Sequence, residues 1–155
     1  MKPTRCLSAI LLSILWGTVA CVHTQVAVTD HSIPDGFARY TKAKEVKAVS
    51  PEGVVYRVRN EDNKPYADLP FWKEALKKRM LDAGYIFLRE APIAADIHKG
   101  YLLELTAPFG QQDYSYLIAI FIQEKKILIV EAAGEVTQVT GHREAILAAI
   151  SHLSF

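Results

Sequence analysis

Hydrophobic and polar positions alternate along much of residues 41–155, and this alternation predicts β-strands. Residues 45–49 and 54–60 alternate, and residues 50–53 between them place Pro and Gly as a type I turn prefers, so we expect a hairpin here. Four more strand candidates follow later in the chain: residues 85–92, 99–108, 114–123 and 126–134. The last two are almost continuously apolar, which is typical of central strands that are covered on both faces.

Two other segments have the three-to-four-residue periodicity of amphipathic helices. Residues 70–84 follow a capping position at Asp68 or Leu69, end at Gly84, and place Trp72, Ala75, Leu76, Met80 and Ala83 on one face. Lys73, Lys77 and Lys78 are expected to face water. Residues 140–155 form the second helix, with Thr140 as its cap and an apolar stripe of Ile146, Ala149, Ile150 and Leu153.

These elements predict an α+β fold: a mostly antiparallel sheet of about six strands with two amphipathic helices, in the order ββαββββα. The order resembles the PsbP-like fold, which is shared by the extrinsic photosystem subunit and by bacterial envelope proteins of the DcrB type. The resemblance covers most of residues 45–154 and rests on element order, with no diagnostic motif. It implies a binding or assembly factor, although a fold alone does not define a function.

The first twenty residues have the pattern of an export signal. Lys2 and Arg5 precede the apolar residues 7–16, and small residues follow as far as Ala20. A membrane-spanning helix is the alternative, but it needs about 20 mainly apolar residues and this run is shorter.

Residues 18–21, Thr-Val-Ala-Cys, resemble the lipobox of bacterial lipoproteins, although Thr18 stands where Leu is usual. The resemblance implies that Cys21 receives a diacylglycerol and that the chain is cut just before it. It further implies an outer-membrane location facing the periplasm, because Val22 is not the Asp that commonly retains such proteins at the inner membrane. Cys6, the only other cysteine, would leave with the signal.

The chain is thereby divided into a cleaved signal (residues 1–20), a lipidated cysteine with a flexible tether (21–40) and a single α+β domain (41–155). The tether has no sustained periodicity, and its two histidines, His23 and His31, lack the carboxylates or thiols that would complete a metal site. Removal of the signal leaves 16 basic residues against 17 acidic ones. Such a balanced charge gives no reason to expect a nucleic-acid partner.

No familiar catalytic motif occurs in the sequence, and we expect no enzyme activity, cofactor or metal. Glu104 and Glu131 are the exceptions that deserve weighing, because each carboxylate lies within an apolar strand and buried carboxylates can serve catalysis. The alternative is that each lies at the rim of the sheet, paired with a lysine or with water. His98 and His142 are expected to be ordinary surface histidines.

Two loops have the tyrosine-rich and polar composition of partner-binding surfaces. Residues 108–116 supply Phe109, Gln111, Gln112, Asp113 and Tyr114, and residues 60–72 supply Tyr66. The leading hypothesis is therefore a membrane-anchored envelope lipoprotein that acts as a non-enzymatic binding or assembly factor for another envelope protein. The alternative is a carrier of a small apolar or lipid ligand, held between the sheet and a helix.

Overall fold

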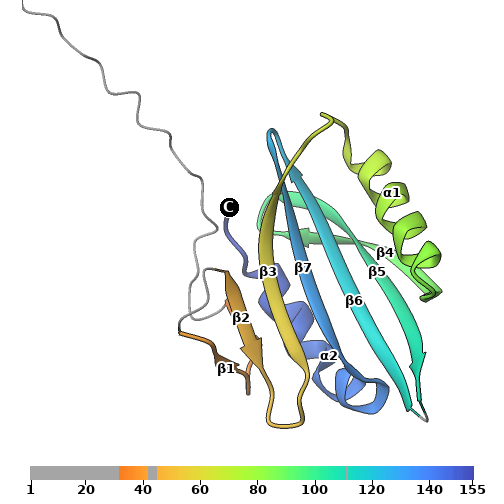
Figure 1. Cartoon of the computed structure of the whole chain (residues 1–155). Helices are drawn as coiled ribbons and strands as arrows, with labels where there is room; N and C mark the ends of the chain where they lie inside the picture. The colour runs from red at the N-terminus through yellow and green to blue at the C-terminus, as the bar shows by residue number, and fades with distance from the viewer. Residues whose placement is uncertain (1–31, 42–44, 111) are drawn as a thin grey trace, which may run out of the picture.

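A seven-stranded antiparallel sheet with one helix on each face forms the protein (Figure 1). The computed structural model describes residues 32–41, 45–110 and 112–155. Along the chain, the elements are β1 (Ala38–Arg39), β2 (Val46–Val49), β3 (Val55–Asp62), α1 (Leu69–Asp82), β4 (Ile86–Ala95), β5 (His98–Phe109), β6 (Gln112–Gln123), β7 (Lys126–Glu135) and α2 (Val136–Ser151). Across the sheet, the strand order is β1-β2-β3-β7-β6-β5-β4. The predicted α+β class and element order are confirmed, with β1 as an additional short strand.

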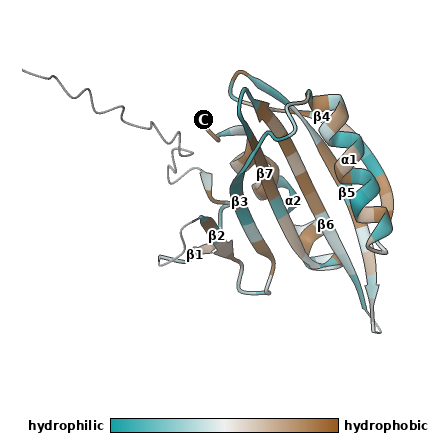
Figure 2. Ribbon diagram, turned by 45° about the horizontal axis from the view of Figure 1, so that its top comes forward, coloured by the Kyte–Doolittle hydropathy of each residue, from teal (hydrophilic) through white to brown (hydrophobic). Residues whose placement is uncertain are grey.

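The central strands β6 and β7 are largely apolar because residues 117–121 of β6 and 127–130 of β7 are buried on both faces of the sheet. One face carries a core that packs against α2 and includes Leu117, Phe121 and Val130. The other face carries a second core beneath α1, which includes Ile118 and Ile129. Figure 2 shows the hydrophobic colouring concentrated on these two strands. The interpretation of their continuous apolar runs is therefore confirmed.

Helix α1 begins at one of the two predicted caps and packs through the predicted stripe. The Asp68 carboxylate accepts a hydrogen bond from the backbone N–H of Phe71 at 3.0 Å. The apolar side chains that pack against the sheet are Leu69, Trp72, Leu76 and Met80. The helix ends at Asp82, and Gly84 follows with φ +89°, a conformation that glycine adopts without strain.

The sequence predicted that three lysines of α1 face water, but two of them attach the helix to the sheet instead. Lys73 and Lys77 donate to the Glu90 carboxylate on β4, at 2.6 and 3.2 Å. Their ammonium groups also lie over the rings of Tyr101 and Phe87. Alternation along β4 places Glu90 on the face that α1 covers, and this pairing could not be seen from the helix pattern alone.

Helix α2 begins at Val136, four residues before Thr140. The prediction of Thr140 as its cap is therefore wrong. The cap is Glu135, whose carboxylate accepts hydrogen bonds from the backbone N–H groups of Thr137 and Gln138, at 3.1 and 3.3 Å. The helix also ends earlier than predicted, at Ser151. Its apolar stripe is confirmed, since Ile146, Ala149, Ile150 and Leu153 are all buried.

The described segment that precedes β2 packs against the domain. Phe37 lies edge-on to Tyr56 and to His142, with ring centroids 6.5 and 5.1 Å away, and Ser32 is fully buried. Arg39 of β1 pairs with Ala48 of β2. The folded part of the chain thus includes residues 32–40, which the sequence had placed in the tether. Cys21 and the signal lie outside the described residues.

Within residues 32–41, 45–110 and 112–155, no helix combines the length and apolarity needed to cross a bilayer.

Candidate functional site

On the α1 side of the sheet, no helix of the described residues covers β3 and the adjoining part of β7. Helix α1 packs against β4, β5 and β6, while β3 and β7 continue beyond it on the same face (Figure 1). Alternation along β3 and β7 points Arg57, Arg59, Ile129, Glu131 and Ala133 to this side. We call this uncovered part of the sheet the open face.

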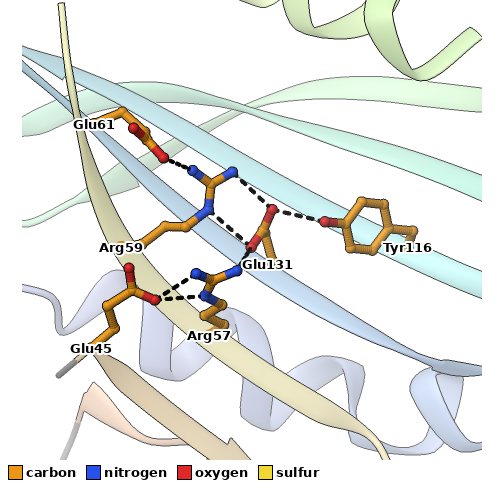
Figure 3. A network of polar contacts seen from close by, with 6 residues as sticks. All are labelled: Glu45, Arg57, Arg59, Glu61, Tyr116 and Glu131. Atoms are coloured by element: carbon orange, nitrogen blue, oxygen red, sulfur yellow. Dashed lines mark hydrogen bonds and ion pairs between the residues drawn. The ribbon is translucent and has the colours of Figure 1, made fainter. Parts of the chain in front are cut away.

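Glu131 lies at the centre of the open face and holds a network of polar contacts together (Figure 3). Arg59 binds it through two nitrogens, with Nε 3.2 Å from Oε2 and Nη2 3.1 Å from Oε1. The hydroxyl of Tyr116 donates to Oε1 at 2.8 Å, and a guanidinium nitrogen of Arg57 lies 3.8 Å from Oε2. The side chains of Glu131 and Arg59 are 14% and 19% exposed, so these contacts are largely shielded from water.

Each arginine of the network also binds a more exposed carboxylate at its edge. Arg57 contacts Glu45 at 2.6 Å, and Arg59 contacts Glu61. Two guanidinium groups therefore share one central carboxylate and two peripheral ones. Such a shared arrangement fixes the position of every charged group in the network.

The arginines keep Glu131 ionised. Burial alone would raise its pKa, but the hydrogen bonds from Arg59 and Tyr116 and the two guanidinium charges outweigh burial, so its pKa lies below the ordinary value. Burial and the neighbouring carboxylate raise the pKa of Tyr116. The network is therefore a set of fixed charges at neutral pH, and Glu131 has no proton to donate.

Glu104, the other carboxylate weighed as a catalytic group, lies on the opposite face of the sheet. It alternates with Leu103 and Leu105 along β5 and points towards α2. Arg143 of α2 binds it at 2.7 Å, and Arg89 of β4 binds it at 2.9 Å. The sheet thus separates Glu104 from Glu131, and the two do not form a pair. Arginines, rather than the lysine or water of the alternative interpretation, hold both carboxylates.

Both histidines that were assigned to the surface have partners within the domain. His142 on α2 lies 2.8 Å from the Glu52 carboxylate, and His98 lies 3.0 Å from the main-chain oxygen of Phe155 and stacks on its ring. No group of three or more His, Cys, Asp or Glu side chains in the described ranges is placed to hold a metal ion.

Two hollows flank the Glu131 network on the open face. The first, which we call the helix groove, lies between α1 and the strands β3, β7 and β6, and has a volume of about 360 Å³. The second, the tyrosine hollow, has a volume of about 450 Å³ and is lined by Tyr85, Ala107, Tyr114, Ser115, Tyr116 and Ala133.

The register of β6 and β7 places the two hollows in line. Ile120 pairs with Ile129 in the groove, Ile118 with Glu131 in the network, and Tyr116 with Ala133 in the hollow. Successive same-face pairs along a strand are about 7 Å apart, so the two hollows are centred roughly 14 Å apart. The open face thus carries a groove, an ion-paired centre and an aromatic hollow in a row.

The two predicted partner loops lie at opposite ends of the sheet and do not form one surface. Asn63, which begins the loop that carries Tyr66, binds the β6–β7 turn through the main-chain oxygens of Glu124 and Lys125. Phe109 and Gln112 pair at the other end of β6, which is a twelve-residue strand of about 36 Å.

The structure places the residues predicted at the β5–β6 end of the sheet in different positions. Tyr114 is 37% exposed and lines the tyrosine hollow, which makes it the predicted residue that the structure places in the candidate site. Gln112 and Asp113 are exposed strand residues, Phe109 belongs to β5, and Gln111 lies outside the described residues. Tyr116, which lies in the same predicted segment 108–116, also lines the hollow, whereas Tyr85 was missed.

No family model matches the sequence, and no curated protein matches it. Solved structures show its fold. PA94 from Pseudomonas aeruginosa, a protein of unknown function, superposes with a TM-score of 0.60 and 11% identity, over 77% of this chain and 97% of that one. CyanoP, the cyanobacterial PsbP of Synechocystis sp. PCC 6803, superposes with a TM-score of 0.55 and 11% identity, over 84% of this chain and 91% of that one. The chain therefore has an α+β fold similar to that of PsbP, as its element order predicted.

Proposed function

We propose that this chain is a lipid-anchored protein of the bacterial envelope, at the periplasmic side of the outer membrane, that acts as a non-enzymatic binding or assembly factor for another envelope protein. The tyrosine hollow carries the proposal. Tyr85, Tyr114 and Tyr116 surround a floor of small side chains, and tyrosine is among the residues that contribute most to protein interfaces.

Two rings of the hollow, those of Tyr85 and Tyr116, are held in place by contacts within the domain. The Tyr116 hydroxyl is bound to Glu131, and the ring of Tyr85 packs on that of Tyr116 with centroids 5.5 Å apart. A partner that binds rigid rings loses little side-chain entropy, which favours affinity. The ion-paired state of Glu131 and Glu104 also supports binding rather than turnover, because neither carboxylate is available as a general acid or base.

Co-purification from envelopes tests this surface. The full-length protein with an affinity tag would be compared with its Tyr114→Ala and Tyr85→Ala variants, each expected to reduce recovery of the partner about tenfold or more. Tyr66→Ala is the matched control, because Tyr66 is an exposed tyrosine at the far end of the sheet. Unchanged recovery with Tyr85→Ala and Tyr114→Ala, or a loss only with Tyr66→Ala, would contradict the assignment.

The anchor has a separate test, since its support is the lipobox resemblance of residues 18–21. Several acyl chains hold a protein at a bilayer far more durably than one chain does. Cys21→Ser is therefore expected to move the protein from the membrane fraction to the supernatant, and Cys6→Ser is expected to leave it in the membrane. A Cys21→Ser protein that stays uncleaved in the membrane would show a spanning segment instead.

A second candidate function, the carrier of a small apolar or lipid ligand, is favoured by the helix groove, whose floor is formed by Ile120, Ile127 and Ile129. Native mass spectrometry of the Cys21→Ser protein tests it. A carrier is expected to retain non-covalent mass, and a protein that never does so in any preparation would contradict this candidate.

A further inference from the structure

The helix groove has an apolar interior and a charged mouth. Ile120, Ile127 and Ile129 form its floor, and Trp72, Ala75 and Leu76 of α1 form one wall. The charged residues of its lining are Arg59, Glu61, Asp62, Lys64 and Arg79. A volume of about 360 Å³ lies at the lower end of the range of ligand pockets, roughly 300–1,000 Å³. Such a lining suits a ligand with a hydrocarbon body and one polar end.

Arg79 is the charged residue at this mouth that the fold does not use. Arg59 and Glu61 bind each other, and Asp62 binds both Lys64 and Lys126. Among the charged side chains that line the groove, Arg79 alone forms no ion pair or hydrogen bond with the described residues. A guanidinium group offers a planar fork of donors that matches a carboxylate or phosphate.

We propose that the helix groove binds a single-chain amphipathic anion, with its acyl chain on the isoleucine floor and its anionic head on Arg79. The inference rests on the carrier function and names the chemical class of the cargo. A carboxylate and a phosphate head share the chemistry that Arg79 recognises, so a fatty acid and a phosphorylated lipid are distinguished by experiment.

Charge complementarity selects an anion over a cation or a neutral hydrocarbon. A cationic head would meet Glu61 and Asp62, but Arg59, Lys64 and Lys126 already neutralise these carboxylates. A neutral chain would bury on the floor and leave Arg79 unused. An anionic head gains the guanidinium of Arg79 at no loss to any existing ion pair.

Contacts on both sides of α1 hold the wall of the groove that carries Trp72. The indole Nε1 of Trp72 donates to the side-chain oxygen of Asn63 at 2.7 Å, and Asn63 is buried. At the other side of α1, Lys73 and Lys77 hold the helix to Glu90. These contacts favour a preformed groove, which avoids the free-energy cost of opening.

Photo-crosslinking on the full-length protein in nanodiscs of zwitterionic lipid tests the proposal. The probe is a hexadecanoic acid analogue that carries a diazirine near the end of its chain, and adducts are mapped by peptide mass spectrometry. Labelling is expected on the peptides that contain Trp72 to Leu76 and Ile127 to Ile129. Excess hexadecanoate or hexadecyl phosphate is expected to compete, and the more effective of the two identifies the source of the head group. Hexadecanol at the same concentration is expected to compete at least tenfold more weakly.

Two variants and one matched control separate the head from the chain. Arg79→Glu is expected to reduce labelling about tenfold or more, because it replaces attraction by repulsion. Ala75→Trp is expected to abolish labelling by filling the groove. Lys78→Glu makes the same change of charge on the same helix, but Lys78 binds Asp82 outside the groove, so labelling should not change. Circular dichroism of each variant verifies that it is folded.

Labelling that is insensitive to Arg79→Glu, or that hexadecanol competes as well as hexadecanoate does, would overturn the proposal. Failure here is distinguishable from failure of the carrier function. Retained mass in the native spectrum that survives Arg79→Glu keeps the carrier and overturns the anionic head. Partner recovery depends on Tyr85 and Tyr114 in the other hollow, so it is scored separately.

Discussion

Asn63 and Trp72 are joined by a hydrogen bond of 2.7 Å from the indole Nε1 to the side-chain oxygen of Asn63. The same oxygen accepts the backbone N–H of Ala67, and the Asn63 amide donates to the main-chain oxygens of Ala67 and Glu124. One buried side chain thereby links the loop before α1, the helix itself and the β6–β7 turn. These contacts fix the end of the helix groove at which α1 begins.

Asn63→Ala is expected to lower the free energy of unfolding by about 3 kcal/mol, because it leaves several buried donors and acceptors without partners. Urea denaturation followed by circular dichroism measures the change. Asn60→Ala is the matched control, since Asn60 is an exposed residue of β3 and should change stability by less than about 0.5 kcal/mol. Equal effects of the two substitutions would show that the linking role of Asn63 is wrong.

The ion pairs of Glu131 predict that the stability of the folded protein decreases at acidic pH. Its pKa in the folded protein lies below the ordinary value of 4.5, so its ionised form contributes stability that is complete above about pH 5. That contribution is lost as the pH falls below 4.5 and through the lower pKa of the folded state. Denaturation midpoints measured between pH 3 and pH 7 should therefore fall at the acid end in the wild type.

The Glu131→Gln variant isolates this contribution. It is expected to be about 2 kcal/mol less stable at pH 7 and to depend less on pH below 5, because Arg57 and Arg59 lose the central carboxylate that they share. Tyr116→Phe removes one hydrogen bond and keeps both arginines, so it should flatten the dependence less. An acid slope that Glu131→Gln leaves unchanged would assign the dependence to other carboxylates.

Two glycines predict stability changes of opposite sign. A Cβ at Gly100 would lie 2.5 Å from the main-chain oxygen of Ile120 and 2.5 Å from the ring of Phe121, so Gly100→Ala should destabilise the protein by about 3 kcal/mol. Gly141 lies within α2, and a Cβ there would have no atom within 4 Å. Gly141→Ala should stabilise the protein by about 0.5 to 1 kcal/mol. Thermal denaturation of both variants under one condition tests this prediction. A loss of stability in both variants would contradict it.

The start of α2 gives a direct comparison between the observed cap and the predicted one. Glu135→Ala removes the acceptor of two backbone N–H groups and is expected to cost about 1 kcal/mol. Thr140→Ala should cost much less, since the Thr140 hydroxyl only donates to the main-chain oxygen of Val136 within the helix. A larger loss from Thr140→Ala, measured by urea denaturation, would restore the original prediction.

The sequence predicted the fold well because periodic burial is a local signal. Strands such as β6, and the apolar stripe of α1, follow from the period of the hydrophobic residues. The start of α2 was missed because a glutamate caps it, although Val139, seven residues before Ile146, continues the buried stripe. Strand β1 was missed because two residues are too few for a pattern, and its pairing with β2 depends on tertiary contacts.

The candidate site was less accessible from the sequence, because strand register assembles it. Tyr114 was named as a residue of a tyrosine-rich segment, and the structure places it in the lining of the tyrosine hollow. Its companion Tyr85 precedes β4, two strands away across the sheet from β6, so proximity along the chain could not reveal it. The sequence placed Tyr66 in a second contact loop, but it could not show that this loop lies about one strand length away from Tyr114. Arg79 was not singled out from the sequence, because its position at the groove depends on how α1 packs on the sheet.

The entry of the chain into the domain has a consequence for how its surfaces can be used together. Phe37 packs on His142 and on the core beneath α2, whereas the groove, the Glu131 network and the tyrosine hollow all lie on the α1 side. The sheet therefore lies between residues 32–37, which lead into β1, and the open face. A bulky partner or cargo on the open face would therefore meet no steric conflict from residues 32–37.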